Sequence, residues 1–187
     1  MLIVFIPLFI CFGWIMGGRL SRLEQTDIRW LPLCLLSCLL ELLLTPAYRY
    51  LPWPREAWIR LPVCGSYLLI FLFLWRNRKL RKTALLAGLG SLCNFLVIAV
   101  NDFRMPVSQG VLQHLSSQRL QQLQSGAIPL YAAADGQTRL LFLGDIIPVP
   151  VLGGFASIGD LLLTAGLFFC LMAIMSPDRL PGWWKKG

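Results

Sequence analysis

Two aspartates are the residues of this sequence whose type and spacing best suit catalysis. Asp145 and Asp160 each follow a glycine, and they lie fifteen residues apart in a strongly apolar stretch. Two carboxyl groups that share one proton can act as base and acid on an attacking water molecule. A partly buried position raises the pKa of one carboxyl, which this division of roles requires. The pair therefore predicts the catalytic residues of a membrane-embedded, aspartate-dependent hydrolase or peptidase.

Five further polar residues are expected to surround the aspartates and bind substrate. Asn94 and Asn101 are seven residues apart, almost two helical turns, and therefore point the same way from one helix. Ser157 shares a helix face with Asp160 through its spacing of three residues. Polar and ionisable groups in membrane helices usually face the bundle interior or a water-filled cavity. The candidate substrate-binding residues are Glu41, Asn94, Asn101, His114 and Ser157.

Each of these residues also has an ordinary structural interpretation. Ser157 and Asp160 could cap the helix that begins there, since an acid suits the positive end of the helix dipole. Asn94 could simply bridge two helices, and Gly90 on the same face would let a neighbouring helix approach closely. Three others could have local roles in a turn or at the membrane surface, namely Asp145, Glu41 and His114. A shared site is favoured because all of them are expected on one side of the membrane.

The composition indicates an integral membrane protein. Of the 187 residues, 57% are hydrophobic and only 14% are charged, and the mean hydropathy is +0.67. Soluble proteins carry about 25% charged residues. No basic residue precedes the first apolar run and no A-x-A-like cleavage site follows it, so we expect this run to be retained as a helix. Crossing a bilayer takes about 20 mainly apolar residues, and the sequence predicts five spans, at residues 2–18, 30–45, 61–75, 84–101 and 158–176.

The basic residues indicate how these spans are oriented. Eleven Lys and Arg lie in the first, third and fifth segments outside the spans, against six in the second and fourth. Cytoplasmic loops carry the excess of basic residues, so we expect the N-terminus outside, the C-terminus in the cytoplasm and the protein in the cell membrane. The formal net charge of +8 then reflects topology. No basic patch is interleaved with aromatic residues, so we expect no nucleic-acid partner.

The long segment 102–157 lies between the fourth and fifth spans and is expected on the outer face. Ser108 is a candidate N-cap for a helix. Apolar residues alternate with Gln and Ser at helical spacing from there to about residue 124, with a break near Ser116 and Ser117. This pattern predicts an external amphipathic helix that lies in the plane of the membrane interface.

A small β-hairpin is expected next. Asp135-Gly136 lies between two apolar runs, which is a strong hairpin signal, and the hairpin would cover about residues 128–143. Four residues that disrupt regular structure then lead to the last span: Pro148, Pro150, Gly153 and Gly154. The predicted fold is a single all-α membrane domain over residues 1–187. It has five transmembrane helices, with the amphipathic helix and the hairpin between helices 4 and 5.

Two short motifs contain candidate site residues. Residues 89–94 read Leu-Gly-Ser-Leu-Cys-Asn, and residues 155–160 read Phe-Ala-Ser-Ile-Gly-Asp. They resemble the glycine-rich, asparagine-containing helix and the second aspartate motif of lipoprotein signal peptidases. That resemblance implies an aspartate pair at the outer membrane face of a helix bundle. The sequence departs from the family at Val97 and Ala156, where the family has Asp and Asn, and its Phe-to-Asp spacing is one residue longer.

A wider pattern runs from about residue 60 to 175. It consists of Asn94, Asn101, Met105-Pro106, His114, Gly144-Asp145-Ile146-Ile147-Pro148 and Ser157-Ile158-Gly159-Asp160. This pattern resembles a family of small multi-pass bacterial membrane proteins known only as a domain of unknown function. The resemblance implies a bacterial multi-pass protein and carries no assigned activity.

Other functions are compatible with the same residues. The protein could be a non-enzymatic module that binds a lipid headgroup, a peptide or a partner protein, or an accessory subunit of a membrane complex. His114, Asp145 and Asp160 could supply ligands for a divalent ion, but no H-x-x-x-H or C-x-x-C spacing supports this. We expect no cofactor and no resident metal. Besides the lipid bilayer, the expected partners are a peptide or lipid substrate or another membrane protein.

Overall fold

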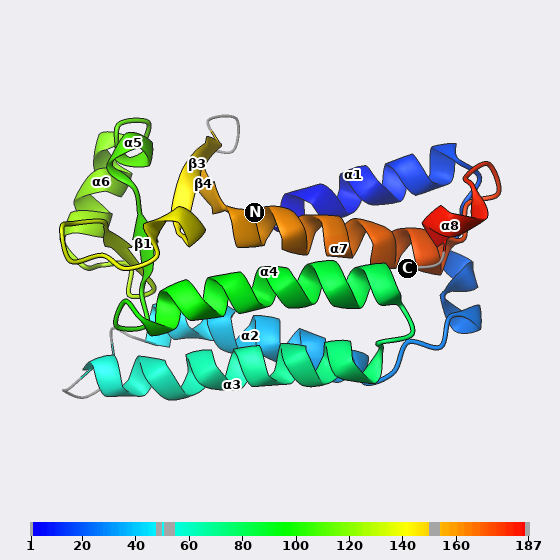
Figure 1. The fold of residues 1–187 in the computed structure, drawn as a ribbon, viewed down its shortest axis with the longest axis horizontal. Coiled ribbons are helices and arrows are strands. Elements are labelled where there is room, and N and C mark those ends of the chain that lie inside the picture. The colour runs from blue at the N-terminus through cyan, green and yellow to red at the C-terminus, as the bar shows by residue number, and fades with distance from the viewer. Residues whose placement is uncertain (1, 48–49, 51–54, 150–153, 186–187) are drawn as a thin grey trace.

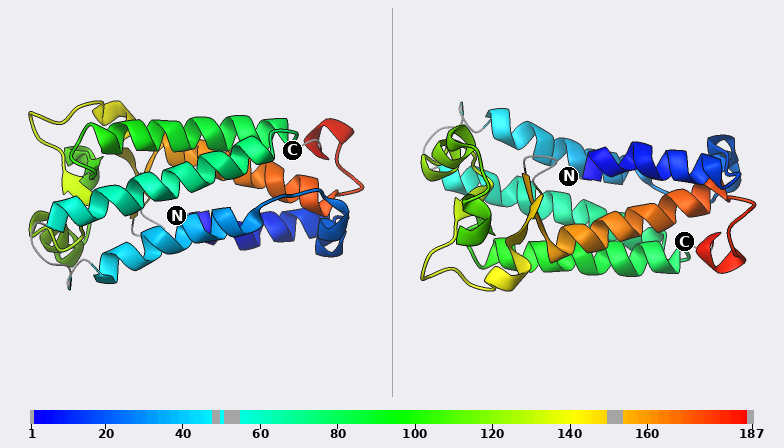
Figure 2. Two further views of the ribbon diagram at one scale, coloured as in Figure 1. Left: turned by 90° about the horizontal axis from the view of Figure 1, so that it is seen from below. Right: turned by 90° about the horizontal axis from the view of Figure 1, so that it is seen from above.

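The helices form an elongated bundle with a smaller β-layer at one end. The structure is a computed structural model, and it describes residues 2–47, 50, 55–149 and 154–185. α1 packs along α7, α2 along α3, and α4 against both α3 and α7 (Figures 1 and 2). A short 3-10 helix, η1 (Leu20–Gln25), and α8 (Gly182–Lys185) lie at the end away from the β-layer. The long helices are α1 (Leu2–Ile15), α2 (Leu31–Ala47), α3 (Arg55–Arg76), α4 (Arg81–Ala99) and α7 (Ile158–Met175).

Three of these helices contain segments long and apolar enough to cross a membrane: Trp58–Arg76, Arg81–Ala99 and Ile158–Met175. Only 28% to 33% of the residues in these segments are buried inside the protein, and many of their leucines are exposed. A helix that is apolar on all sides requires an apolar environment on all sides. Lipid supplies that environment here, so the chain is a membrane protein.

α1 and α2 are apolar, but the apolar stretches found in them are shorter than the sequence runs that predicted the first two spans. Their apolar stretches cover Val4–Ile15 and Leu31–Leu43. Just beyond α1, Gly17 adopts a φ of 85°, a left-handed conformation that commonly follows the end of a helix. α2 begins directly after Trp30, which has a φ of 59°. The prediction of five spans therefore stays a prediction for these two helices.

The β-layer is a four-stranded sheet in the order β2-β1-β3-β4. β1 is parallel to both β2 and β3, and β3 is antiparallel to β4. The chain enters the layer from α4 and leaves it into α7 (Figure 1). The protein is mostly helical, as predicted. The predicted all-α class allowed for one small hairpin, whereas the structure has a four-stranded sheet. Its strands are β1 (Met105–Val107), β2 (Tyr131–Ala133), β3 (Asp145–Val149) and β4 (Gly154–Ser157).

The predicted amphipathic helix is present in two pieces, α5 (Gln109–Leu112) and α6 (Ser117–Gln124). Ser108 caps α5, because its Oγ accepts a hydrogen bond of 3.4 Å from the backbone N–H of Val111. The predicted cap and the break before Ser117 are therefore confirmed. The apolar side chains of both pieces pack with β1 in one small core, formed by Val107, Val111, Leu112 and Leu123. The helical periodicity thus reflects packing within the β-layer.

The hairpin predicted over residues 128–143 is wrong. β2 pairs with β1 in parallel, and Leu141–Leu143 forms a 3-10 helix, η2, instead of a returning strand. The turn at Asp135 does form, since its Oδ1 accepts a hydrogen bond from a backbone N–H two residues on. Beyond the turn, the carboxamide of Asn101 binds the backbone of Arg139 through two hydrogen bonds of 2.8 and 2.9 Å. These bonds direct the chain away from β2.

A hairpin forms instead in the stretch that was expected to be irregular. β3 and β4 pair with each other there, and Pro148 lies within β3. Among the described residues β3 pairs with β1 only at Asp145, so at Pro148 the strand has a partner on one side only, where proline is tolerated. Gly154 begins β4. Pro150 and Gly153 lie outside the described residues.

α4 and α7 pack closely because small residues face each other. A Cβ atom placed on Gly90 would lie 2.5 Å from the carbonyl oxygen of Gly159. One placed on Gly166 would lie 2.8 Å from the backbone nitrogen of Ala87. Both distances are too short for a real contact, so only glycine permits this approach. The prediction that Gly90 allows a close helix contact is confirmed. The contact also brings Asn94, one turn farther along α4, against the first turn of α7.

Candidate functional site

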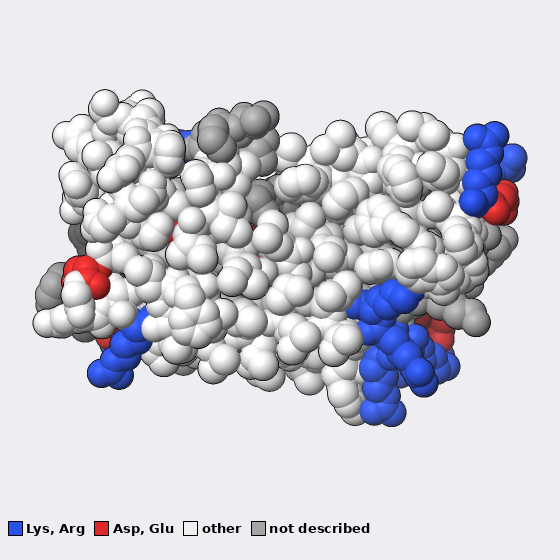
Figure 3. All heavy atoms as spheres, turned by 45° about the horizontal axis from the view of Figure 1, so that its top comes forward, with Lys and Arg blue, Asp and Glu red and all other residues white. Residues whose placement is uncertain are grey.

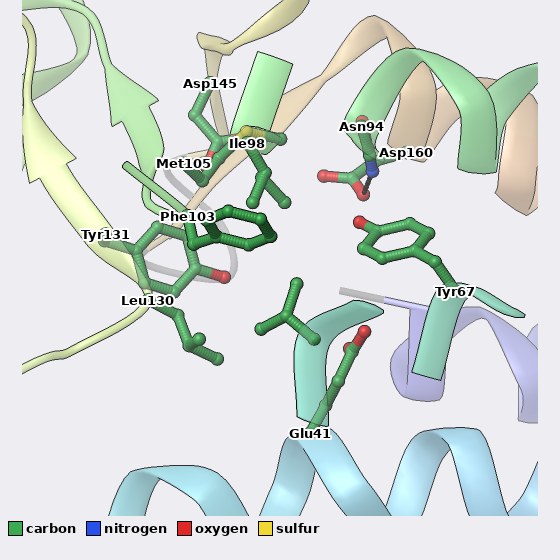
Figure 4. Close-up of a pocket in the computed structure, with 11 residues that line it drawn as sticks. Glu41, Tyr67, Asn94, Ile98, Phe103, Met105, Leu130, Tyr131, Asp145 and Asp160 are labelled. Atoms are coloured by element: carbon green, nitrogen blue, oxygen red, sulfur yellow. Dashed lines mark hydrogen bonds between the residues drawn. The ribbon is translucent and has the colours of Figure 1, made fainter. Parts of the chain in front are cut away.

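A cavity of about 130 Å³ lies between the helix bundle and the β-layer. Residues from α2, α3, α4 and α7 line one side, and residues at β1, β2 and β3 line the other (Figure 4). Its apolar wall consists of Val63, Ile98, Phe103, Met105 and Leu130. Its polar groups are three carboxyls, two phenols and one carboxamide, from Glu41, Tyr67, Asn94, Tyr131, Asp145 and Asp160. This volume holds several water molecules or one small chemical group.

Asp160 is held at the start of α7 by a capping box. Its backbone N–H donates to Ser157 Oγ at 2.9 Å, and its Oδ2 accepts from the Ser157 N–H at 3.2 Å. Its Oδ1 accepts a hydrogen bond of 3.1 Å from Asn94 Nδ2 on α4. The helix-cap interpretation is therefore confirmed, and the same side chain also lines the cavity. Both oxygens of the Asp160 side chain therefore have an N–H donor at the start of α7.

Asn94 and Ser157 form the support behind Asp160. Ser157 is fully buried, and its Oγ donates a hydrogen bond of 2.8 Å to Asn94 Oδ1. Because the amide oxygen of Asn94 is bound to Ser157, its amide nitrogen faces Asp160. Asn94 thus bridges α4 and α7, as its structural interpretation proposed, and it contributes to the cavity wall. Ser157 is not among the lining residues, so it positions its two neighbours.

Asp145 has a different environment. It begins β3, is only 2% exposed, and its Oδ1 has no hydrogen-bond partner among the described residues. Burial, with a smaller contribution from the charge of Asp160, raises the pKa of this carboxyl to about 8. At neutral pH Asp145 therefore keeps its proton. A protonated carboxyl can donate a hydrogen bond inside the cavity.

Glu41 brings a third carboxyl group from α2. Its Oε1 accepts a hydrogen bond of 3.0 Å from the Oγ of Ser66, a buried residue of α3. The side chain points into the cavity from the side opposite Asp145 and Asp160 (Figure 4). Glu41 therefore lines the cavity, and the residue also keeps an exposed surface.

Sequence reasoning misses two tyrosines that line the cavity. Tyr67 of α3 points its hydroxyl toward Asp160, and Tyr131 of β2 points its hydroxyl into the cavity (Figure 4). Burial raises the pKa of Tyr131, and the carboxyls of Asp145, Asp160 and Glu41 raise it further, so this phenol stays protonated and can donate. Both tyrosines lie in apolar runs of the sequence, and a buried tyrosine hydroxyl needs a polar partner. This combination is the sequence signal that could have identified them as site residues.

Asn101 and His114 do not belong to the residues that line the cavity. Besides binding the backbone of Arg139, Asn101 donates through Nδ2 to the carbonyl of Val97 at 2.7 Å, so it fastens the β-layer to α4. His114 lies exposed in the turn after α5. Their predicted substrate-binding roles find no support in this placement. Within the described part of the chain, no three His, Cys, Asp or Glu side chains group in a way that could hold a metal ion.

The arrangement brings together two carboxyl groups in different environments. Asp160 accepts a hydrogen bond on each of its carboxyl oxygens, whereas Asp145 is desolvated and has a raised pKa. Two carboxyls whose environments separate them in this way can divide the roles of base and acid. Phenol hydroxyls on the same cavity can donate hydrogen bonds to a developing negative charge.

Comparison with known proteins gives a family but no activity. No curated protein and no solved structure matches the chain, so the resemblance to lipoprotein signal peptidases has no support. A family model matches residues 25–172, a range that contains every residue of the cavity wall. The matched range also contains the candidate spans Trp58–Arg76 and Arg81–Ala99 and most of Ile158–Met175. The chain therefore belongs to DUF5317, a family of unknown function.

Proposed function

We propose that the cavity is the active site of a membrane-embedded, aspartate-dependent hydrolase that cleaves peptide bonds. The observation that carries this proposal is the contrast between its two aspartates. Asp160 accepts hydrogen bonds on both oxygens, and Asp145 is buried with a pKa of about 8. Lysozyme obtains its acid and its second carboxylate in this way, from two carboxyls in unlike environments.

The proposed reaction gives each aspartate one role. Asp160 accepts a proton from a water molecule as the water oxygen bonds to the substrate carbonyl carbon. Asp145 donates its proton to the carbonyl oxygen, and the hydroxyls of Tyr67 and Tyr131 donate hydrogen bonds that stabilise the tetrahedral centre. When the carbon–nitrogen bond breaks, the amide nitrogen takes the proton held by Asp160. The Asp145 proton returns from the oxygen, so the products are a carboxylic acid and an amine.

The lining of the cavity favours a peptide over a phospholipid as the substrate. Three carboxyl groups line it, and none of its lining residues is Lys, Arg or His. A phosphodiester would therefore meet acidic groups with no counter-charge, which is unfavourable in a desolvated site. A peptide bond is neutral and offers a carbonyl oxygen to the phenols. The apolar wall suits an aliphatic or aromatic side chain next to the cleaved bond.

The proposal includes the membrane topology expected from the sequence. Lys and Arg gather mainly at the end of the bundle that carries α8 and the α3–α4 loop, and the middle of the visible face is nearly free of charge (Figure 3). By the positive-inside rule this end is cytoplasmic. The cavity and the β-layer then lie at the outer face of the cell membrane of a bacterium. α1 and α2 complete a set of five spans.

Cleavage of peptides by the purified protein tests the proposal. The full chain in detergent is incubated with a peptide library, and new termini are identified by mass spectrometry. Asp145→Asn is expected to lower the cleavage rate about a hundredfold or more, since general acid catalysis contributes this much. Asp102→Asn is the matched control, because Asp102 is exposed and has a φ of 52°, which asparagine tolerates well. Equal cleavage by the wild type and Asp145→Asn would rule out the acid role.

The stability of the protein is expected to depend on the proton of Asp145. Its pKa is raised from 3.8 to about 8 in the folded state, so the folded state binds more protons than the unfolded state between these values. The free energy of unfolding then falls as pH rises from about 4 through about 8, by at most about 1.4 kcal/mol per pH unit. Asp145→Asn should remove most of this slope. Unfolding midpoints of both proteins across this pH range measure it, and parallel curves would contradict the raised pKa.

A second candidate is a non-enzymatic module that binds a cation. Glu41 favours this alternative, because a third carboxyl has no part in the hydrolytic steps but would strengthen the binding of an amine. Under this reading the wild type cleaves nothing. Removing one carboxyl then weakens the binding of a small primary amine by a graded amount, measured by calorimetry. Cleavage that depends on both aspartates separates the two candidates.

A further inference from the structure

A second pocket, of about 210 Å³, lies at the opposite end of the bundle from the cavity. It is formed where the chain between η1 and α2 meets the loop between α3 and α4. Its lining residues include Thr26, Asp27, Arg29, Arg76, Asn77 and Lys79. Three of these are basic and one is acidic, in contrast with the acidic cavity at the other end.

The pocket is held open by a buried asparagine. Asn77 Oδ1 accepts a hydrogen bond of 2.9 Å from the Arg29 N–H, and its Nδ2 donates at 2.8 Å to the carbonyls of Arg29 and Phe73. These bonds join the two chain segments that form the walls. The pocket shape therefore does not depend on a ligand, and a preformed site loses less free energy on binding.

The positive charge in the pocket is only partly neutralised. Arg29 forms an ion pair with Asp27, with 2.8 Å between Nη2 and Oδ2. Arg76 and Lys79 form no ion pair with any residue that the structure describes. The pKa of Asp27 is lowered first by its hydrogen bond from Arg29 and then by the charges of Arg29, Lys79 and Arg76. The charges of Arg76 and Lys79 therefore act inside the pocket.

The pocket lies at the level where a membrane would end. α3 finishes its candidate span at Arg76, and the span of α4 begins at Arg81. Trp30 and Trp75 are both exposed at this end, and the Arg76 guanidinium lies 5.6 Å from the Trp30 ring centre. Exposed tryptophans mark the interface between lipid tails and water. Basic pockets between membrane helices at this level bind the headgroups of anionic lipids.

We propose that Arg76 and Lys79, in the pocket braced by Asn77, bind a phosphate-bearing anion. The chemistry suits the phosphodiester of an anionic lipid headgroup and also a free phosphate ion. The guanidinium can form paired hydrogen bonds with two phosphate oxygens, and the ammonium adds a point charge. This site is independent of the hydrolase proposal, because it lies at the other end of the bundle and shares no residue with the cavity.

The test measures how ligands raise the unfolding temperature of the full chain in a non-ionic detergent. Three ligands are compared: dihexanoyl phosphatidylglycerol, dihexanoyl phosphatidylcholine and inorganic phosphate. The pocket variant is Arg76→Gln with Lys79→Gln. The control is Arg78→Gln with Arg81→Gln, which removes the same charge from the same region outside the pocket lining. A charge-conserving variant, Arg76→Lys with Lys79→Arg, shows whether the exchanged side chains still allow folding and binding.

We expect an anionic ligand to stabilise the wild type and the control at similar concentrations. The pocket variant should need about thirtyfold more ligand, since it lacks two basic groups and each contributes about fivefold near a lipid surface. Stabilisation by phosphatidylglycerol alone assigns the site to a lipid headgroup, and stabilisation by inorganic phosphate assigns it to a free ion. Equal effects of phosphatidylglycerol and phosphatidylcholine without any effect of phosphate would overturn the proposal. Equal weakening in the pocket and control variants would overturn it too.

Discussion

Replacing Asp160 with asparagine is expected to lower the rate of peptide cleavage about a thousandfold while the protein keeps its fold. The carboxylate is the only group in the proposed mechanism that takes a proton from the attacking water, and asparagine cannot accept one. Loss of a general base commonly lowers turnover by about a hundredfold to ten-thousandfold. The loss should fall on kcat, because the side-chain volume and the lining of the cavity change little.

The fold should tolerate this change because asparagine keeps half of the hydrogen bonds. Its amide oxygen can still accept a bond from Asn94 or from the Ser157 N–H, both of which bind Asp160 now. The other donor then faces an amide nitrogen and loses its partner. One lost hydrogen bond at a helix start costs about 1 kcal/mol. The unfolding temperature in detergent should fall by only a few degrees.

Ser157→Ala separates the catalytic role of Asp160 from its role as a helix cap. Alanine keeps the carboxylate but removes the Oγ that binds Asn94 and the Asp160 N–H, at 2.8 and 2.9 Å. We expect a loss of about 1 to 2 kcal/mol of stability, with a much smaller loss of cleavage than in Asp160→Asn. If both variants lose the same activity, Asp160 acts by holding α7 in place and the base role fails.

Gly90→Ala is expected to destabilise the protein by about 3 kcal/mol or more. A Cβ at this position would lie 2.5 Å from the carbonyl oxygen of Gly159 and 2.8 Å from the backbone nitrogen of Leu163. Both atoms belong to the backbone of α7, so no side-chain rotation can relieve the overlap. α4 and α7 must move apart along their contact, and overpacking of this kind costs about 1 to 3 kcal/mol even where side chains can adjust.

Gly88→Ala provides the matched control for this prediction. Gly88 lies on the same helix two residues earlier, and a Cβ there would meet its nearest atom, Cδ1 of Leu74, at 4.0 Å. This is ordinary van der Waals contact, so the change should leave stability unaltered or raise it slightly through helix propensity. Unfolding of both variants in mixed detergent micelles measures the difference. Equal stability would mean that α4 and α7 do not meet at Gly90.

Gly90→Ala should also reduce activity through the cavity. Asn94 follows one turn later on α4, and its amide reaches Asp160 across the same helix contact. Separation of the helices lengthens this bond, which leaves the carboxylate with one donor fewer. Partial loss of cleavage in the folded fraction of this variant is therefore expected, and Gly88→Ala should cleave normally.

Several features of the site follow from local spacing and could be predicted from the sequence. Ser157 and Asp160 are three residues apart at the start of an apolar run, which is the spacing of a capping box. Gly90 and Asn94 share one face of a helix, so a close contact and a polar group were expected together. Ser108 caps α5 for the same local reason. Such features depend only on neighbours within one or two helical turns.

The β-layer could not be predicted in this way. β2 pairs with β1, a strand from another part of the chain, and does so in parallel. Parallel pairing carries no local turn signal, because its two strands are joined by a long crossover. The turn at Asp135 does form. The carboxamide of Asn101 then binds the backbone of Arg139, which the predicted hairpin would have used for strand pairing. Strand pairing is decided by the whole set of available partners.

By itself the sequence determined that this is a helical membrane protein with two aspartates near one end. Apolar runs and helical spacing are local properties, and they are written directly in the order of residues. Only the tertiary structure decided that Glu41, Tyr67 and Tyr131 join Asp145 and Asp160 around one cavity. It also decided that Oδ1 of Asp145 is buried with no hydrogen-bond partner among the described residues, while each carboxyl oxygen of Asp160 accepts a hydrogen bond. Burial and hydrogen bonding depend on which distant segments pack together, and they give the two aspartates their different environments.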